Sequence, residues 1–439
     1  MSADVNRRTA LGLAGALTGA LAGSVATGAR AQTGGDPFAI TRVRAHLDVL
    51  ERGGDLRTGE PGERALTEYL AAQLTAAGFE AARADVAAPF FEARAAELSW
   101  PGASVRVAPQ AIVRATSPDG LEAPLALWRD ESDGPRVAGA IALIQLPYAR
   151  HSQVVSPLIR PRIEAAVAAG ARAAVLITDG PTGETIHLNA PHERALTDIP
   201  LASLGPKPGA AALAAARAGA MGRLLIDGEG GVRTGENVWG RIERGGPLLV
   251  VSTPHSGWTH ALAERGPGVA SFIALAHWAA RALRRHSLLF TSATAHEYDN
   301  WGAHAFLDSA AAPAPARTAL WVHLGAGFAA RDFHEFGGYR LAPLASADPQ
   351  RLLVGSAALL PALRAAYRGL AGLETPYAAA RGVAGELGEI HAAGYERVFG
   401  LLGAHRFHHI DADRLDKTDP AFIRDAALAT RAAIASILR

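Results

Sequence analysis

The sequence contains no cysteine, which excludes disulfides, thiolate zinc ligands and cysteine nucleophiles. It also lacks an excess of either charge, since 43 lysines and arginines face 42 aspartates and glutamates. No long basic run is present, so nothing indicates a nucleic-acid partner or an anionic membrane surface. Any metal ion must therefore bind to histidine and carboxylate side chains.

Apolar side chains, by contrast, make up 49% of the 439 residues. This length and composition predict an ordered globular protein with room for two or three domains. The sequence carries no indication of an oligomeric state.

The first 31 residues have the pattern of an export signal. Arg7 and Arg8 precede a weakly apolar run, and Ala29-Arg30-Ala31 places small residues where a signal peptidase cleaves. This pattern resembles a twin-arginine signal. The alternative is an uncleaved anchor, but the run is barely hydrophobic enough to stay in a bilayer. We therefore expect a signal peptide at 1–31, a periplasmic or secreted protein, and no stable membrane insertion after cleavage.

The next part of the chain changes its periodicity twice. Apolar residues at helical spacing predict helices at 42–50 and 63–77, with a glycine- and proline-containing turn between them. From about 90 to 235, short apolar runs alternate with glycine and proline turns, which predicts a separate small α/β module. Its expected strands are Ala138–Gln145, Ala173–Thr178 and Arg223–Ile226, and its expected helices are Pro161–Ala169 and Gly209–Ala218.

From Asn237 onward, apolar runs alternate with helical patterns. This order predicts a doubly wound α/β fold, with a mainly parallel sheet covered by helices on both faces. In such sheets, ligand-binding groups gather where the strands end. The expected strands are Leu248–Ser252, Leu288–Thr291, Leu320–His323 and Val398–Leu402, and the expected helices are Ala270–Leu283, Trp301–Asp308, Leu352–Tyr367 and Pro420–Leu438.

Side chains that can bind a metal follow four of these strands. They are His255, Glu297, His323 and His409. Zinc takes histidine nitrogen and carboxylate oxygen, usually as four ligands. A single histidine among the 16 in the chain is more often a hydrogen-bonded or surface residue. It is the shared placement at strand ends that favours a metal site.

Several stretches resemble the co-catalytic zinc aminopeptidase and glutamate carboxypeptidase family. They include Arg57–Gly62 before a helix, Gly302–Phe306, and Leu415–Pro420 before the last helix. The middle segment, with Val137–Leu143 and Ala168–Val175, resembles the protease-associated insert of many such enzymes. The resemblance implies a peptidase-like domain at 38–89 and 236–439, interrupted by the insert at 90–235.

The resemblance also implies two zinc ions, held by five side chains and bridged by a carboxylate and a hydroxide. His255, Glu297 and His409 match three ligand positions, whereas His323 replaces an aspartate ligand. The stretch that should contain the bridging aspartate becomes Gly266–Val269.

These changes remove two negative charges from the implied cluster. Two zinc ions about 3.5 Å apart would then repel each other with little compensation. We therefore expect at most one zinc ion, bound by His255, Glu297, His323 and His409 in whole or in part. Three protein ligands and a water suit catalysis, whereas four protein ligands make a closed structural site.

His296 occupies the position of the family's glutamate base. It is either a general base or a tolerated substitution. Glu264 and Arg265 stand next to the altered stretch and are candidates for polar groups in the mouth of the site. We expect the insert to contribute specificity but no metal ligand.

The sequence thus predicts an exported, zinc-dependent hydrolase of amide bonds, with a peptide or small amide as substrate. One alternative is a non-catalytic binding protein on the same scaffold. Another is a hydrolase of a non-peptide amide or acyl bond.

Overall fold

The structure is a computed structural model that describes residues 35–151 and 153–439. The predicted export signal at 1–31 lies outside these residues. Within the described part of the chain, every helix is too short or too polar to span a bilayer. Residues 36–439 form one compact unit.

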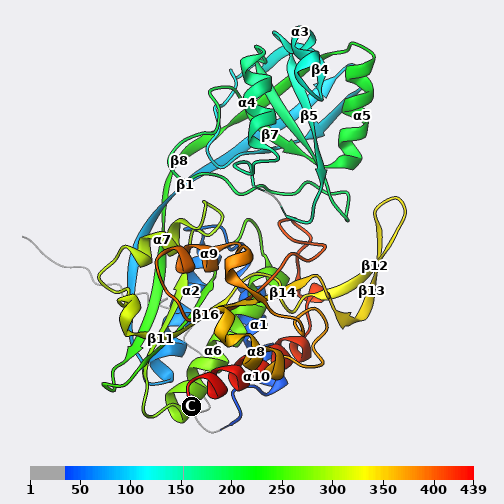
Figure 1. Ribbon diagram of the computed structural model, residues 1–439. Helices are drawn as coiled ribbons and strands as arrows, with labels where there is room; N and C mark the ends of the chain where they lie inside the picture. The colour runs from blue at the N-terminus through cyan, green and yellow to red at the C-terminus, as the bar shows by residue number, and fades with distance from the viewer. Residues whose placement is uncertain (1–34, 152) are drawn as a thin grey trace, which may run out of the picture. The chain divides into compact units, whose positions relative to one another are not determined.

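A mostly parallel sheet forms the centre of the peptidase-like part (Figure 1). Its neighbouring strands β16, β11, β9 and β10 are all parallel. They are continuous apolar runs buried on both faces, as parallel strands between two helix layers require. The predicted doubly wound α/β class is therefore confirmed. The bounds are β9 Leu248–Pro254, β10 Ser287–Ala293, β11 Thr318–Leu324 and β16 Val398–Gly403.

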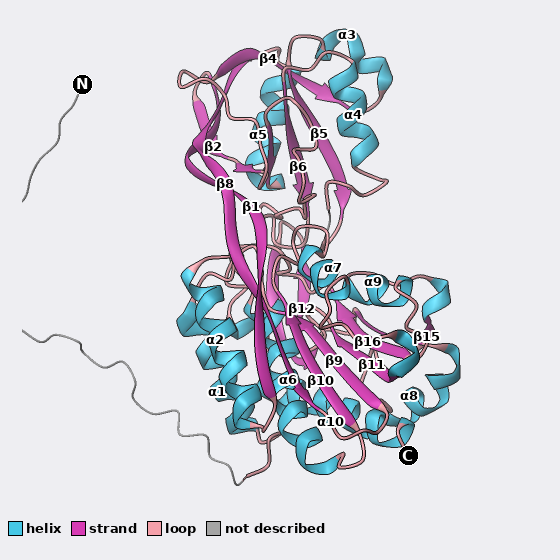
Figure 2. Cartoon of the chain, turned by 90° about the vertical axis from the view of Figure 1, so that its left-hand side faces the viewer, coloured by secondary structure: helices cyan, strands magenta, loops and turns pink. Residues whose placement is uncertain are grey.

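Helices cover both faces of this sheet (Figure 2). Alternate residues of β9 enter different cores: Leu249 and Val251 pack with one helix layer, and Leu248 and Val250 with the other. The larger layer contains α1 (Ile40–Gly53), α2 (Pro61–Ala76), α6 (Leu262–Ala282), α8 (Leu360–Ala366) and α10 (Pro420–Ile437), and the smaller contains α7 (Trp301–Leu307) and α9 (Glu386–Ala392).

Two long antiparallel strands connect the main sheet to the insert. β1 (Glu80–Trp100) and β8 (Met221–Ile242) pair along almost their whole length, and both predicted insert boundaries fall inside them (Figure 2). Between them, four parallel strands form the insert sheet. The insert contains β2 Ala103–Arg106, β3 Ala108–Pro109, β4 Leu121–Trp128, α3 Gly134–Val137, β5 Ile141–Tyr148, α4 Arg160–Ala168, β6 Ala173–Asp179, β7 Leu201–Leu204 and α5 Pro206–Arg217.

One predicted helix is partly wrong. The segment expected to be helical at Leu352–Tyr367 begins as β14 (Arg351–Gly355), which pairs antiparallel with β16, and only its end forms α8. The pairing extends the sheet and buries Leu353 and Val354, which overrides the local helical pattern. Three further strands are absent from the prediction: β15 (Tyr377–Ala378), which pairs with β14, and β12 (Arg331–Phe336) and β13 (Arg340–Ala347), which form a separate two-stranded sheet.

Helix α6 also starts eight residues before the predicted Ala270. The early start puts Glu264 and Arg265 on its first turns, beside the ends of the parallel strands. Its early turns contain Gly266, Pro267 and Gly268. A Cβ atom on Gly268 would lie 2.4 Å from Thr253 Oγ1 of β9, so only glycine permits this close approach of helix and sheet. The backbone amides of Ala263 and Glu264 donate to the Asp413 carboxylate, which satisfies the first turn.

Candidate active site

The predicted site residues gather at the edge where the parallel strands end. His255 follows β9, His296 and Glu297 follow β10, His323 is near the end of β11, and His409 follows β16. Five non-glycine residues in the connecting loops have positive φ: Ala261 at 47°, Ala295 at 51°, Asp299 at 56°, Asn300 at 60° and His409 at 58°. Such conformations cost of order 1–3 kcal/mol each and cluster at functional sites.

Arg265, on the first turns of α6, is the central cation of this region. Its side chain is fully buried, and Nη2 lies 2.7 Å from Glu297 Oε1 and 2.9 Å from Glu264 Oε1. Its Nε donates to the backbone carbonyl of Ser256. A buried charge persists only when it is paired in this way. A fixed guanidinium therefore occupies the space between the two carboxylates.

The side-chain oxygens of Glu297 and the ring nitrogens of His255 all have partners within the protein. The second oxygen of Glu297 accepts a 2.6 Å hydrogen bond from Ser256 Oγ. His255 Nδ1 lies 2.9 Å from Ser292 Oγ, and Nε2 lies 3.0 Å from Glu63 Oε1. Both side chains are buried and fully engaged within the protein.

His296 and His323 share one buried carboxyl group. His296 Nδ1 lies 3.0 Å from Glu386 Oε1, and His323 Nδ1 lies 3.9 Å from Glu386 Oε2 and 3.0 Å from Ser252 Oγ. Burial lowers the pKa of His296 to about 3 and that of His323 to about 4, and it raises the pKa of Glu386. Both imidazoles are therefore neutral near pH 7.

His409 differs from the other predicted ligands because one of its nitrogens is free. Nδ1 donates to the backbone carbonyl of His187 at 2.9 Å, so Nε2 carries the lone pair. Nε2 has no hydrogen-bond partner and lies 3.3 Å from Glu264 Oε1. The backbone amide of His187 donates in return to the carbonyl of His409, which joins the insert to this loop.

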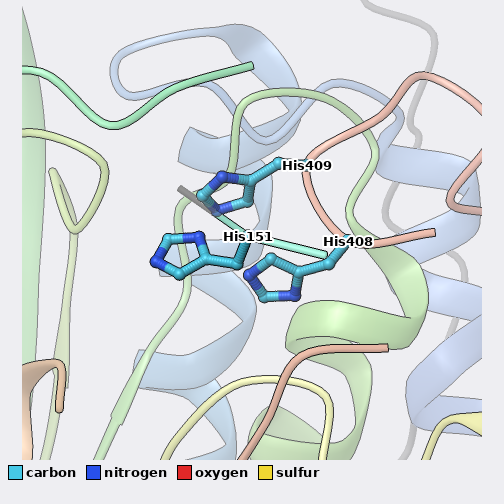
Figure 3. A group of neighbouring side chains, drawn as sticks. All are labelled: His151, His408 and His409. Atoms are coloured by element: carbon cyan, nitrogen blue, oxygen red, sulfur yellow. The ribbon is translucent and has the colours of Figure 1, made fainter. Parts of the chain in front are cut away.

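His409 belongs to a cluster of three histidines (Figure 3). One nitrogen of each of His151, His408 and His409 lies within 4.8 Å of the others. Burial lowers the pKa of His151 to about 3 and that of His408 well below its usual value. Burial alone would raise the pKa of the neighbouring Glu264, but Arg265 and the histidines hold it well below its usual value, so this carboxylate is ionised.

The sequence analysis left His151 out of the site. It follows β5 of the insert, so it too stands just beyond a strand end, which is the signal that could have found it. His408 was visible beside His409, but adjacent residues of a loop seldom face the same centre. Only the tertiary fold brings the two loops together.

A cavity of about 800 Å³ adjoins the site, lined by residues of the insert and of the main sheet's loops. Trp258 and Tyr298 form its aromatic wall, and Trp258 Nε1 donates to Asn189 Oδ1 of the insert. The volume is that of a pocket for a small ligand or short peptide. Its charged lining is mixed, with Arg57, Arg106, Lys207, Arg233, Arg414, Asp55, Glu92, Glu184 and Asp411.

The residues present do not fit two bridged zinc ions, because Arg265 already pairs with both carboxylates. The four predicted ligands, His255, Glu297, His323 and His409, also do not converge on one point. Among the described residues, the only group of three or more His, Asp or Glu side chains with converging ligand atoms is His151, His408 and His409. The four-ligand set stays a prediction.

Comparisons with solved structures support the fold. The chain is similar to a zinc aminopeptidase from Bacillus subtilis, with a TM-score of 0.71 and 15% identity, over 92% of this chain and 96% of that one. It is also similar to a peptidase M28 precursor from Shewanella amazonensis SB2B, with a TM-score of 0.69 and 17% identity over 90% and 94%.

An aminopeptidase from Aneurinibacillus sp. strain AM-1 matches with a TM-score of 0.65 and 16% identity, over 91% of this chain and 95% of that one. No protein-family model matches the chain, and no curated protein sequence matches it significantly. The predicted resemblance to zinc aminopeptidases is thus confirmed at the level of the fold.

Proposed function

We propose that the protein is a zinc-dependent hydrolase that cleaves amide bonds in peptides or amino-acid derivatives, and that it uses one zinc ion. The observation that carries this proposal is the His296–Glu386 pair, in which a neutral imidazole is held 3.0 Å from a buried carboxyl group. Zinc in such a hydrolase polarises the scissile carbonyl and lowers the pKa of a bound water.

His296 is hydrogen-bonded as a general base would be, although burial, which lowers its pKa to about 3, makes it a weak proton acceptor. With Nδ1 engaged by Glu386, its Nε2 lone pair is available to accept a proton from water. The side chain is 13% exposed, so the ring reaches the edge of the buried region. Glu386 fixes the orientation of the ring and compensates the positive charge that forms on it.

The cavity beside the site supports a peptide as substrate. Trp258 and Tyr298 offer apolar surface for a side chain, and the mixed charges of the lining suit a ligand with both an amino and a carboxyl group. The similar solved structures include aminopeptidases, which favours cleavage near an amino terminus.

One observation favours the alternative of a non-catalytic binding protein. Arg265 replaces the charge that a metal would bring to Glu264 and Glu297. In that alternative, these two carboxylates bind no metal, and the protein would keep the cavity for ligand binding but would not catalyse hydrolysis.

Hydrolysis of a broad panel of aminoacyl, dipeptidyl and N-acyl amides tests the proposal. The zinc-loaded protein should cleave at least one member, and the N-acyl amides separate peptides from other amide substrates. His296→Gln should lower turnover by roughly 100-fold or more without loss of metal. His304→Gln is the matched control, because His304 pairs with Glu389 at the surface and should keep wild-type turnover. Cleavage of no member at full zinc occupancy would favour the binding protein.

We also propose that twin-arginine export carries the protein to the periplasm or beyond. The support is the Arg7-Arg8 pattern and the cleavage-site residues of the sequence. Replacement of both arginines by lysine should leave uncleaved precursor in the cytoplasm, as detected by immunoblot of cell fractions. Normal cleavage of that variant would argue against this route.

A further inference from the structure

We infer that His151, His408 and His409 form a binding site for one divalent ion of the zinc type, and that the insert supplies one of its three ligands. This site differs from the ligand set expected from the sequence, of which it shares only His409. In the proposed hydrolase, these three histidines would be the ligands of the single zinc ion. The site could equally bind a metal in a protein that is not a hydrolase.

The geometry of the cluster is close to that of a three-histidine metal site. The three ligand atoms lie within 4.8 Å of one another. Nitrogens bound to one tetrahedral zinc at about 2.0–2.1 Å lie roughly 3.4 Å apart. Shifts of about 1 Å would therefore complete the site, and side-chain rotation can supply them.

Unpaired nitrogens are the strongest sign that the cluster binds a ligand. Only eight buried side-chain atoms in the described part of the chain lack a hydrogen-bond partner, and three of them are His151 Nδ1, His408 Nδ1 and His409 Nε2. A buried polar atom without a partner costs about 1–3 kcal/mol, and such atoms are rare in native proteins. A cation bound by one nitrogen of each ring would remove part of this cost.

The surroundings of the cluster also suit a metal ion. The carbonyl of His187 holds His409 Nδ1, which directs Nε2 toward the cluster, and such second contacts orient histidine ligands in metal sites. The ionised carboxylate of Glu264 lies 3.3 Å from His409 Nε2 and 3.7 Å from His408 Nε2. It supplies negative charge beside the three imidazoles.

Packing alone does not account for these rings. His408 and His409 stack at 4.3 Å, and His151 meets His409 edge-on at 4.7 Å. Ring contacts of this kind leave the nitrogens unpaired, whereas the ring nitrogens of buried His255 are both bonded. A metal at the cluster would also fasten the insert to the loop after β16, next to the cavity.

Titration of metal-free protein with Zn²⁺ and with Co²⁺ tests the inference. Calorimetry should give one Zn²⁺ per chain, and Co²⁺ should produce visible absorption bands of a low-symmetry histidine site. His151→Ala should weaken binding by at least 100-fold. His192→Ala is the matched control, because His192 also belongs to the insert but stacks on Trp301 at 3.9 Å. It should bind like the wild type.

His408→Ala provides a second test from the main body, with circular dichroism to confirm that each variant is folded. Wild-type binding in both folded His151→Ala and His408→Ala would overturn the inference, as would no binding by the wild type. One bound Zn²⁺ that depends on His151, without hydrolysis of any amide, would support this inference and count against the proposed hydrolase alone.

Discussion

Two parts of the site, a carboxylate half and a histidine half, differ in how their buried polar groups are paired. In the carboxylate half, Arg265 lies between Glu264 and Glu297, and each carboxylate has a cation from its own chain. In the histidine half, His151, His408 and His409 each have one buried nitrogen without a hydrogen-bond partner, and one nitrogen of each ring lies within 4.8 Å of the others. The first half contains a cation of the chain itself, although Glu264 Oε1 and Arg265 Nη1 make no hydrogen bond, whereas the second half consists of three rings with unpaired nitrogens.

This difference separates structural from ligand-binding groups. A guanidinium on α6 cannot dissociate or deprotonate at neutral pH, so the carboxylate half has a permanent cation. In the histidine half the Glu264 carboxylate lies 3.3 Å from His409 Nε2 and 3.7 Å from His408 Nε2, so a bound cation would pair with this carboxylate as well as with the imidazoles. We therefore assign metal binding to the histidine half and stability to the carboxylate half.

Removal of Arg265 should have the largest effect on stability. Arg265→Met leaves two buried carboxylates without their cation, which should lower the free energy of unfolding by about 3–5 kcal/mol. Urea denaturation of metal-free protein measures this change. Arg94→Met is the control, since Arg94 forms an exposed pair with Asp227 and its loss should leave stability almost unchanged. Equal effects of the two variants would break the comparison.

Zinc should stabilise the wild-type protein through the histidine half. At free zinc about 1,000-fold above its dissociation constant, binding to the folded state alone adds about 4 kcal/mol. The unfolding midpoint should therefore rise with zinc and fall with chelator. In His151→Ala most of this rise should disappear. An equal rise in wild type and His151→Ala would place the ion elsewhere.

His46 offers a smaller test at a buried histidine remote from both halves. Its Nδ1 is paired with the Tyr69 hydroxyl at 2.7 Å, and burial lowers its pKa to about 4. The unfolded chain has a histidine pKa of about 6.5 and binds the proton first as pH falls. The stability contributed by neutral His46 is therefore present above pH 6.5 and is lost as pH falls toward 4.

The loss attributable to His46 is roughly 3 kcal/mol. Unfolding of metal-free wild type and His46→Gln at a series of pH values measures it, and the variant should show the weaker dependence between pH 6.5 and 4. Zinc should leave the difference between the two proteins unchanged. Identical pH profiles would show that His46 is not neutral in the fold.

The sequence predicted the elements with strong local patterns. The runs at Leu248–Ser252 and Val398–Leu402 are almost entirely apolar and form parallel strands. β8 was predicted only at Arg223–Ile226, because its glycines have the pattern of turns although the strand is held by its long pairing with β1. Local composition does not report such pairing.

The sequence predicted where the site residues lie along the strands, but not which side chains they contact. His296 and Glu297 were expected at the end of β10 and lie there. The ion pair of Glu297 with Arg265 depends on the early start of α6, which Gly266 and Pro267 concealed. The meeting of His151 with His409 depends on the placement of the insert. Both are tertiary contacts that no spacing in the sequence encodes.

The location of bound zinc tests the central claim most directly. Anomalous diffraction at the zinc edge, from crystals grown with excess Zn²⁺, should show one peak in the site, bounded by His151, His408 and His409. Arg265 should remain between Glu264 and Glu297, with no peak there. A peak between these two carboxylates with Arg265 displaced, or a pair of peaks bridged by Glu264, would contradict the account.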